Sequence, residues 1–290
     1  MGMTGLPMLC ALGAGTANIA VALAVKGAER RGCRPSTFGA FAMTTAAAIS
    51  LAAACCQSGT WLDWRLWALG VTLGALFYAA IVSMVTANRF GPPSLPWAMA
   101  NLALLAPILL AALFLGEPLR PMDGLMLLAF GGMLAVFARG TSKAGDMVGS
   151  RPAALLLWLT LVFAFNGLLM FGFKLNASLP PDVNPAALSA LMYGTGALLA
   201  WSNAWRGPAA PGRGQEFRYG VCMGLGNGAS LLLLLVAMRL PAAMAFPVIQ
   251  GVSFLGGVCA TALVFHERFN RWKASGLALG LAVILLAVCR

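Results

Sequence analysis

The stretch LFLGEPLRP, from Leu113 to Pro121, ends a long apolar run with a glutamate, a proline and an arginine. A later stretch, LVFHERFNR, from Leu263 to Arg271, ends a second apolar run in a similar way. Glu267 lies 150 positions after Glu117, in a chain with only 8 acidic residues. Two of so few carboxylates at matching places indicate an internal repeat.

The composition indicates a membrane protein. Hydrophobic residues make up 60% of the 290 residues, charged residues make up 9%, and the mean hydropathy is +0.86. A soluble domain carries about 25% charged residues, so this chain has too few to cover a surface in water. The net charge of +11 comes from basic residues in short gaps between apolar runs. This distribution favours membrane topology over nucleic-acid binding.

A helix that crosses the ~30 Å hydrocarbon core needs about 20 mainly apolar residues. Ten segments meet this requirement, at residues 5–25, 35–56, 66–87, 94–116, 121–139, 152–173, 185–205, 219–238, 242–265 and 272–289. The connections are too short for an extra soluble domain. The sequence therefore predicts an all-α integral membrane protein with ten transmembrane helices. Pro107 and Pro247 lie inside two of these segments, where proline kinks or weakens a helix.

Equivalent residues recur between the two halves of the chain. At an offset of 150, Gly70, Gly74, Ala87 and Arg89 match Gly220, Gly224, Ala237 and Arg239, and at an offset of 148, Asn18 and Lys26 match Asn166 and Lys174. We therefore expect two five-helix units, residues 1–145 and 146–290. Because five is odd, the second unit is expected to cross the membrane upside down, an architecture typical of alternating-access carriers.

These features resemble the drug/metabolite transporter superfamily, and within it the EamA-type branch. Typical members carry a Gly-Glu-Arg/Lys-Leu-x-Pro-like signature after the fourth and ninth helices. The fitting residues of the first copy are Gly116, Glu117, Leu119 and Pro121, and those of the looser second copy are Glu267, Arg268 and Phe269, with His266 replacing the glycine. The resemblance implies a secondary carrier of the bacterial inner membrane, often an exporter, but it implies no substrate.

The orientation has two conflicting expectations. Connections after the odd-numbered segments hold 14 of the 19 lysines and arginines, and those after the even-numbered segments, with Arg290, hold 5. Because cytoplasmic loops are richer in these residues, the count predicts both termini outside the cell. The family resemblance implies both termini inside.

Polar side chains within the apolar segments are the candidate substrate-binding residues. They are Asn18, Tyr78, Asn101, Asn166, Asn227 and Gln250. The resemblance implies a cavity lined mainly by helices one, three, four, six, eight and nine, which hold all six. An amide in a membrane helix also serves as a hydrogen bond between helices, so each residue has a structural interpretation too. Taken as a set, they favour a polar cavity.

Four charged residues at segment ends are candidates for gating or structural roles. Lys26 and Lys174 either extend to the interface or attract a carboxylate or phosphate. Glu117 and Glu267 either pair with Arg120 and Arg268, interact with the N-terminus of the next helix, or act in gating or proton coupling. All acidic residues lie in connections or at segment ends, so no carboxylate is expected near the midplane. This argues against a carrier of organic cations.

The leading hypothesis is a secondary transporter that moves a small neutral, zwitterionic or anionic metabolite, amino-acid-like, or a drug, with efflux as the favoured direction. A flippase for lipid-linked sugar or polyprenyl phosphate is the alternative. An intramembrane lipid-modifying enzyme is the least favoured, because clustered catalytic residues are missing. No catalytic residue, cofactor or metal site is predicted, since there is a single histidine and no CxxC pattern. The partners expected are the substrate and the lipid bilayer, while the coupling ion, proton or sodium, and a monomeric or homodimeric state stay open.

Overall fold

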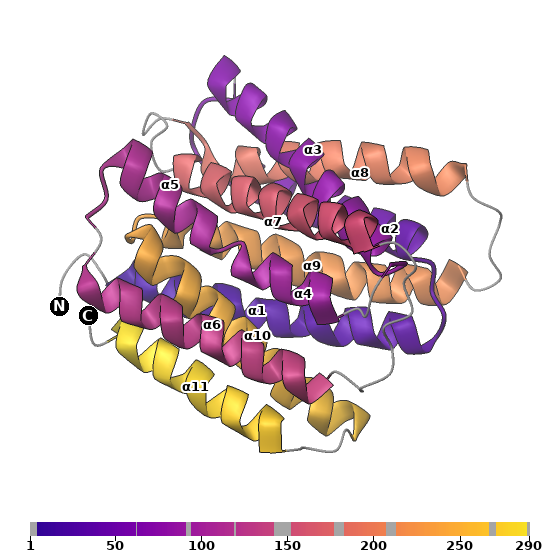
Figure 1. Cartoon of the computed structure of the whole chain (residues 1–290). Helices are drawn as coiled ribbons and strands as arrows, with labels where there is room; N and C mark the ends of the chain where they lie inside the picture. The colour runs from indigo at the N-terminus through magenta and orange to yellow at the C-terminus, as the bar shows by residue number, and fades with distance from the viewer. Residues whose placement is uncertain are drawn as a thin grey trace.

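The computed structural model describes residues 5–61, 63–90, 94–118, 120–141, 152–176, 183–206, 213–266 and 271–288. The helices are α1 (Gly5–Arg30), α2 (Pro35–Cys56), α3 (Trp64–Ala87), α4 (Ser94–Leu102), α5 (Leu105–Leu115), α6 (Pro121–Thr141), α7 (Pro152–Leu175), α8 (Pro185–Trp205), α9 (Arg213–Ala237), α10 (Ala242–Phe265) and α11 (Arg271–Val288). Within these ranges the β contacts amount to one isolated bridge, between Thr60 and Val183. The helices lie side by side, and α1 begins and α11 ends at the left of the view (Figure 1).

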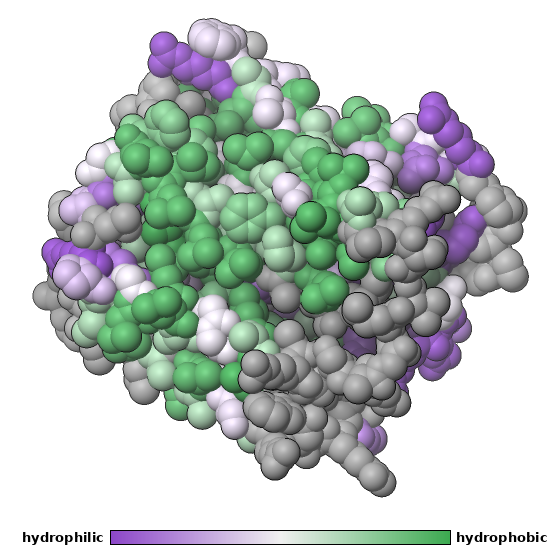
Figure 2. Space-filling model, in the orientation of Figure 1, coloured by the Kyte–Doolittle hydropathy of each residue, from purple (hydrophilic) through white to green (hydrophobic). Residues whose placement is uncertain are grey.

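Several of these helices are suited to a bilayer. The helices α1, α2, α3, α7, α9 and α10 are long and apolar enough to cross a membrane. Many large apolar side chains are exposed, among them Leu128, Leu198 and Leu263. Figure 2 shows hydrophobic residues over the middle of one face and hydrophilic residues toward its left and right edges, near the helix ends. The prediction of a helical protein is therefore confirmed for the described residues, and six of its helices are compatible with the predicted membrane-spanning role.

One predicted segment, residues 94–116, consists of two helices, α4 and α5, that follow one another along a bent line (Figure 1). Pro107 explains the interruption, because it has no N–H for the carbonyl of Ala103 and its ring crowds that carbonyl. The Ala103 oxygen instead accepts a hydrogen bond from the nitrogen of Ala106, at 3.1 Å. By contrast, α10 continues through Pro247.

The ends of α2 are tied to two other helices. Asn184, which caps α8, donates from its side-chain nitrogen to the carbonyl of Ala54 near the end of α2, at 2.8 Å. At the start of α2, the backbone nitrogen of Arg34 donates to Oε1 of Glu216 in the first turn of α9, at 3.0 Å. Hence α8 begins where α2 ends, and α9 begins where α2 begins.

Glycines let α3 approach α8 closely. A Cβ added to Gly70 would lie 2.7 Å from the Cβ of Leu191, and one added to Gly74 would lie 2.5 Å from the carbonyl oxygen of Met192. Real side chains do not reach such distances without displacing a neighbour. The contact between these two helices therefore requires glycine at both positions.

The same kind of contact joins α9 to α2. A Cβ on Gly220 would lie 2.6 Å from the Cβ of Phe41, and one on Gly224 would collide with the carbonyl oxygen of Ala42. Each residue of this contact lies 150 positions from its counterpart in the contact between α3 and α8. The two close helix pairs are thus built from equivalent residues of the two halves.

Candidate functional site

A cavity of about 440 Å³ lies between α1, α4 and α10. Its polar lining includes Asn18 and Lys26 of α1, Asn101 of α4, and Gln250, Ser253 and Thr261 of α10. Apolar side chains such as Val21, Phe254 and Val258 form much of the remaining wall. An apolar cavity with a few converging polar groups is the usual form of a small-molecule site.

The cavity opens toward one end of the bundle. Its lining runs over residues 18–29 of α1 and 250–261 of α10, from the middle of each helix toward its C-terminal end. Toward the opposite end the two helices close on each other. Ala14 is fully buried, and a Cβ on Gly15 would lie 2.7 Å from the Cβ of Val252. We call the open end the Lys26 side and the closed end the Lys174 side.

Asn101 lies at the break between α4 and α5. Its side chain is buried, it occupies the last turn of α4, and its carbonyl accepts a hydrogen bond from the nitrogen of Leu104 at 3.3 Å. Irregular backbone within a membrane is tolerated where it is buried in protein or lines a cavity. The helix break and the buried amide of Asn101 therefore occur together beside the cavity.

On the Lys174 side, a buried polar network joins three parts of the chain. Lys174, near the end of α7, is 6% exposed. Its Nζ donates to the carbonyl oxygens of Met238 at 3.1 Å and Leu240 at 2.7 Å, and it forms an ion pair with Glu117. The other carboxylate oxygen of Glu117 accepts a hydrogen bond from the backbone nitrogen of Ala242, at 2.7 Å. The network therefore links the ends of α5 and α7 to the start of α10.

This network differs from the pairings considered from the sequence. Glu117 contacts Lys174 and the N-terminus of α10, whereas the backbone nitrogen of Arg120 donates to Asp123 at 2.8 Å and helps to begin α6. Lys174 is buried, and its amino group contacts protein atoms inside the bundle. The reason is tertiary, because α5 packs against α7 and brings two residues distant in sequence together. Glu267 lies outside the described residues.

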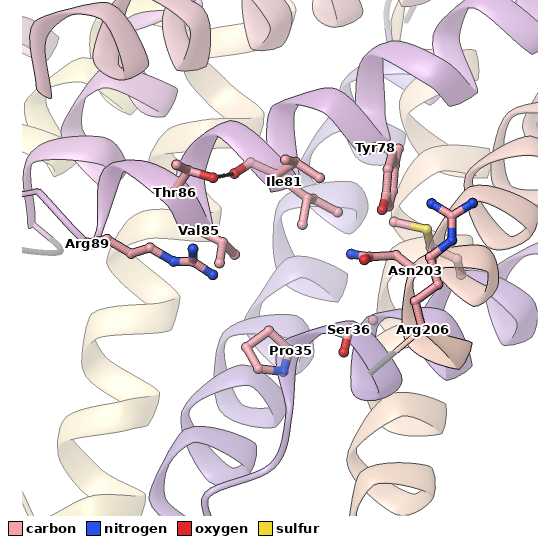
Figure 3. Close-up of a pocket in the computed structure, with 13 residues that line it drawn as sticks. Pro35, Ser36, Tyr78, Ile81, Val85, Thr86, Arg89, Asn203 and Arg206 are labelled. Carbon is pink, nitrogen blue, oxygen red and sulfur yellow. Dashed lines mark hydrogen bonds between the residues drawn. The ribbon is translucent and has the colours of Figure 1, made fainter. Parts of the chain in front are cut away.

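The remaining candidate residues lie elsewhere. Tyr78 lines a second pocket, between α2, α3 and α8 (Figure 3). The side-chain nitrogen of Asn166 donates to the carbonyl of Val162 in its own helix, at 2.8 Å. Asn227 is half-buried, and its carbonyl accepts a hydrogen bond from the hydroxyl of Tyr193 at 3.1 Å. Among the six candidates, the structure thus brings Asn18, Asn101 and Gln250 into one cavity with Lys26.

Sequence reasoning missed Ser253 and Thr261, although a signal for them was present. Both lie on the face of α10 that carries Gln250, at spacings of 3 and 11 residues. Residues at these spacings share one face of a helix. Once Gln250 is taken as a cavity residue, its helix face therefore predicts that Ser253 and Thr261 line the cavity too.

Metal-binding side chains do not cluster in the part of the chain that the structure describes. No three histidine, cysteine, aspartate or glutamate residues there lie close enough to hold a metal ion. The polar groups of the cavity are mainly amides and hydroxyls, with Lys26 and Glu29 toward its open end. Such groups bind and orient a molecule by hydrogen bonding.

Comparisons with known proteins indicate the fold of the chain but do not indicate an activity. No family model and no curated protein matches the chain. The chain is similar to a solved structure described as "Crystal structure of protein", with 19% sequence identity and a TM-score of 0.77. The likeness covers 97% of this chain and 98% of the other. At this identity the likeness shows a shared fold over nearly the whole length.

Proposed function

We propose that the protein is a secondary transporter that moves a small neutral, zwitterionic or anionic metabolite by alternating access. The observation that carries this proposal is the polar cavity between α1, α4 and α10, whose lining among the described residues extends from mid-helix toward the Lys26 side. The buried network around Lys174 and Glu117 lies on the opposite side. A site that is open to one side and sealed on the other is what one state of such a carrier requires.

The wall of the cavity on α10 has a buried counterpart in the first half of the chain. The wall includes Phe254, Val258 and Thr261. The residues 150 positions earlier are Leu104, Ile108 and Ala111. All three of these counterparts are buried. Equivalent faces of the two halves are therefore in opposite states, one open and one closed.

Part of the wall on α1 follows the same pattern, although the counterparts of Asn18 and Ala22, which are Asn166 and Met170, are half-buried. Val21 and Val25 line the cavity, and their counterparts 148 positions later, Leu169 and Phe173, are buried. Lys26 lines the open cavity, whereas its counterpart Lys174 lies in the buried network. This supports two inverted units of five spans, residues 1–145 and 146–290, in which α4 and α5 together form one span. Exchanging the conformations of the two units would open the Lys174 side.

The groups deep in the cavity support the class of substrate. Asn18, Asn101 and Gln250 are neutral donors and acceptors, and Glu29, the carboxylate of the lining, lies toward the open end. A permanent organic cation would have no carboxylate at the depth of these amides. A molecule with carboxylate, amide or hydroxyl groups can satisfy them by hydrogen bonding.

Flux into proteoliposomes tests this proposal. A labelled panel of amino acids, nucleosides, sugars and organic cations is offered with and without a pH gradient. We expect saturable flux of one neutral, zwitterionic or anionic class, lost in Asn18→Ala/Gln250→Ala and retained in Gln57→Ala, a matched amide at the exposed end of α2. Folded protein that carries nothing in the panel would contradict the proposal and favour lipid-linked cargo.

A further inference from the structure

A second pocket, of about 370 Å³, lies between α2, α3 and α8. Among the described residues it shares no lining residue with the cavity between α1, α4 and α10. Its lining includes the start of α2 at Pro35 and residues just beyond the ends of α3 and α8, Arg89 and Arg206. The pocket therefore lies at the Lys26 side, where these helices end. We call it the Arg89–Arg206 pocket.

Several hydrogen-bond donors line this pocket. Figure 3 shows Tyr78, Asn203 and Arg206 near one another on one side, with Arg89 reaching in from the opposite wall. None of the described residues that line the pocket is acidic. Two guanidinium groups, a phenol and an amide, with no carboxylate among the described lining residues, favour a phosphate group, which arginine recognises through paired hydrogen bonds.

The start of α2 also borders this pocket. Pro35 and Ser36 of its first turn are lining residues. The carboxylate of Glu216 already lies at this helix end, where it accepts a hydrogen bond from the Arg34 nitrogen, so the preference of the pocket for an anion rests on its arginines.

The rest of the lining is largely apolar. It includes Met43, Ile81, Val82, Val85 and Ala200. The hydroxyl of Thr86 donates to the carbonyl of Val82 at 2.7 Å, so this residue adds little polarity to the wall. A cationic rim next to an apolar wall fits an amphiphile that has an anionic head and a hydrocarbon tail.

We propose that the Arg89–Arg206 pocket binds an anionic phospholipid, with the headgroup phosphate between the two arginines and part of an acyl chain on the apolar wall. The helix ends place the arginines where headgroups lie. Basic residues near the membrane surface are attracted to anionic lipid. This inference does not depend on the proposed transport activity.

The test measures which lipids remain with the purified protein. Protein from nanodiscs of equal phosphatidylglycerol and phosphatidylcholine is transferred to detergent, and the retained lipids are quantified by mass spectrometry. We expect several-fold enrichment of phosphatidylglycerol, lost in Arg89→Gln/Arg206→Gln. The matched control is Arg65→Gln/Arg239→Gln, which removes the same charge at the opposite helix ends and should keep the enrichment. Equal loss in both variants, or enrichment that survives in the first, overturns the proposal.

Two further arms separate the pocket from charge alone and the lipid from free phosphate. Gly39 lines the pocket, and a Cβ there meets nothing within 4 Å, so Gly39→Phe fills the pocket and keeps both arginines. We expect this variant to lose the enrichment, and its retention would refute binding within the pocket. Glycerol phosphate should not displace the retained lipid at millimolar concentration. Displacement would mean that the site recognises phosphate without the acyl chain.

Discussion

Neutralising Glu117 is expected to open the Lys174 side. In Glu117→Gln, Lys174 keeps its two carbonyl partners but loses the carboxylate, and it is only 6% exposed. Removing one partner of a buried ion pair costs about 3–5 kcal/mol. The Glu117 side chain is 21% exposed, and solvent screens part of the interaction. We therefore expect the substitution to destabilise the present conformation by about 2 kcal/mol. A conformation in which this network is already broken is not destabilised by the substitution. The equilibrium between the two conformations should therefore shift about 30-fold toward the one with the broken network.

The assay compares two single-cysteine variants in a background without the 7 native cysteines. Val258→Cys places a thiol in the open cavity, and Ile108→Cys places one at the buried counterpart, which is 1% exposed. With a membrane-impermeant maleimide, we expect the first to react and the second to be protected. Adding Glu117→Gln should speed labelling at position 108 at least tenfold and slow it at position 258.

The control makes the same chemical change on the Lys26 side. Glu29→Gln alters the mouth of the open cavity and should leave position 108 protected. Continued protection of position 108 in correctly folded Glu117→Gln protein would refute the gating role of the network.

Three further predictions concern packing, the helix break and orientation. Gly74→Ala should lower the thermal unfolding temperature in detergent, because its Cβ would meet a backbone carbonyl and overpacking costs about 1–3 kcal/mol. The control Gly194→Ala places its Cβ in open space and should leave that temperature unchanged. Equal unfolding temperatures for the two variants would contradict the close contact at Gly74. Pro107→Ala should restore the hydrogen bond to the Ala103 carbonyl, raise that temperature and slow flux, whereas unchanged flux would show that the break is not needed. Burial, and to a lesser extent the Glu216 carboxylate, raise the pKa of Cys33 between α1 and α2. The thiolate of Cys33 therefore forms at higher pH than that of an exposed cysteine. The pH midpoint of maleimide labelling should be raised accordingly, and Glu216→Gln should lower it. The basic-residue count also predicts that Cys33 is labelled from the cytoplasm only.

Hydropathy predicted much of the helical framework. The apolar runs identify where helices lie, although α9 begins at Arg213, six residues before the predicted segment, because polar turns outside the bilayer remain helical. Pro107 marked the segment that the structure divides into α4 and α5. Local chemistry is sufficient for these features, since each depends on residues within a few turns.

The site was predictable only in part. An amide within an apolar segment reveals its depth in the membrane, and this identified Asn18, Asn101 and Gln250. Depth does not reveal the direction in which a side chain points, so Tyr78 was grouped with these residues although it lines a different pocket. The contact between Glu117 and Lys174 depends on how α5 packs against α7, which a single sequence does not specify.

The most direct test of alternating access is to label one mid-cavity position separately from each side of the membrane. Gln250→Cys, alone and combined with Glu117→Gln, is exposed to an impermeant maleimide in right-side-out and inside-out vesicles. The account predicts rapid labelling from the Lys26 side in the single variant, and labelling from the Lys174 side once Glu117 is neutralised. Labelling from the Lys26 side alone in both variants would contradict it, because the cavity would then be a pocket with one entrance.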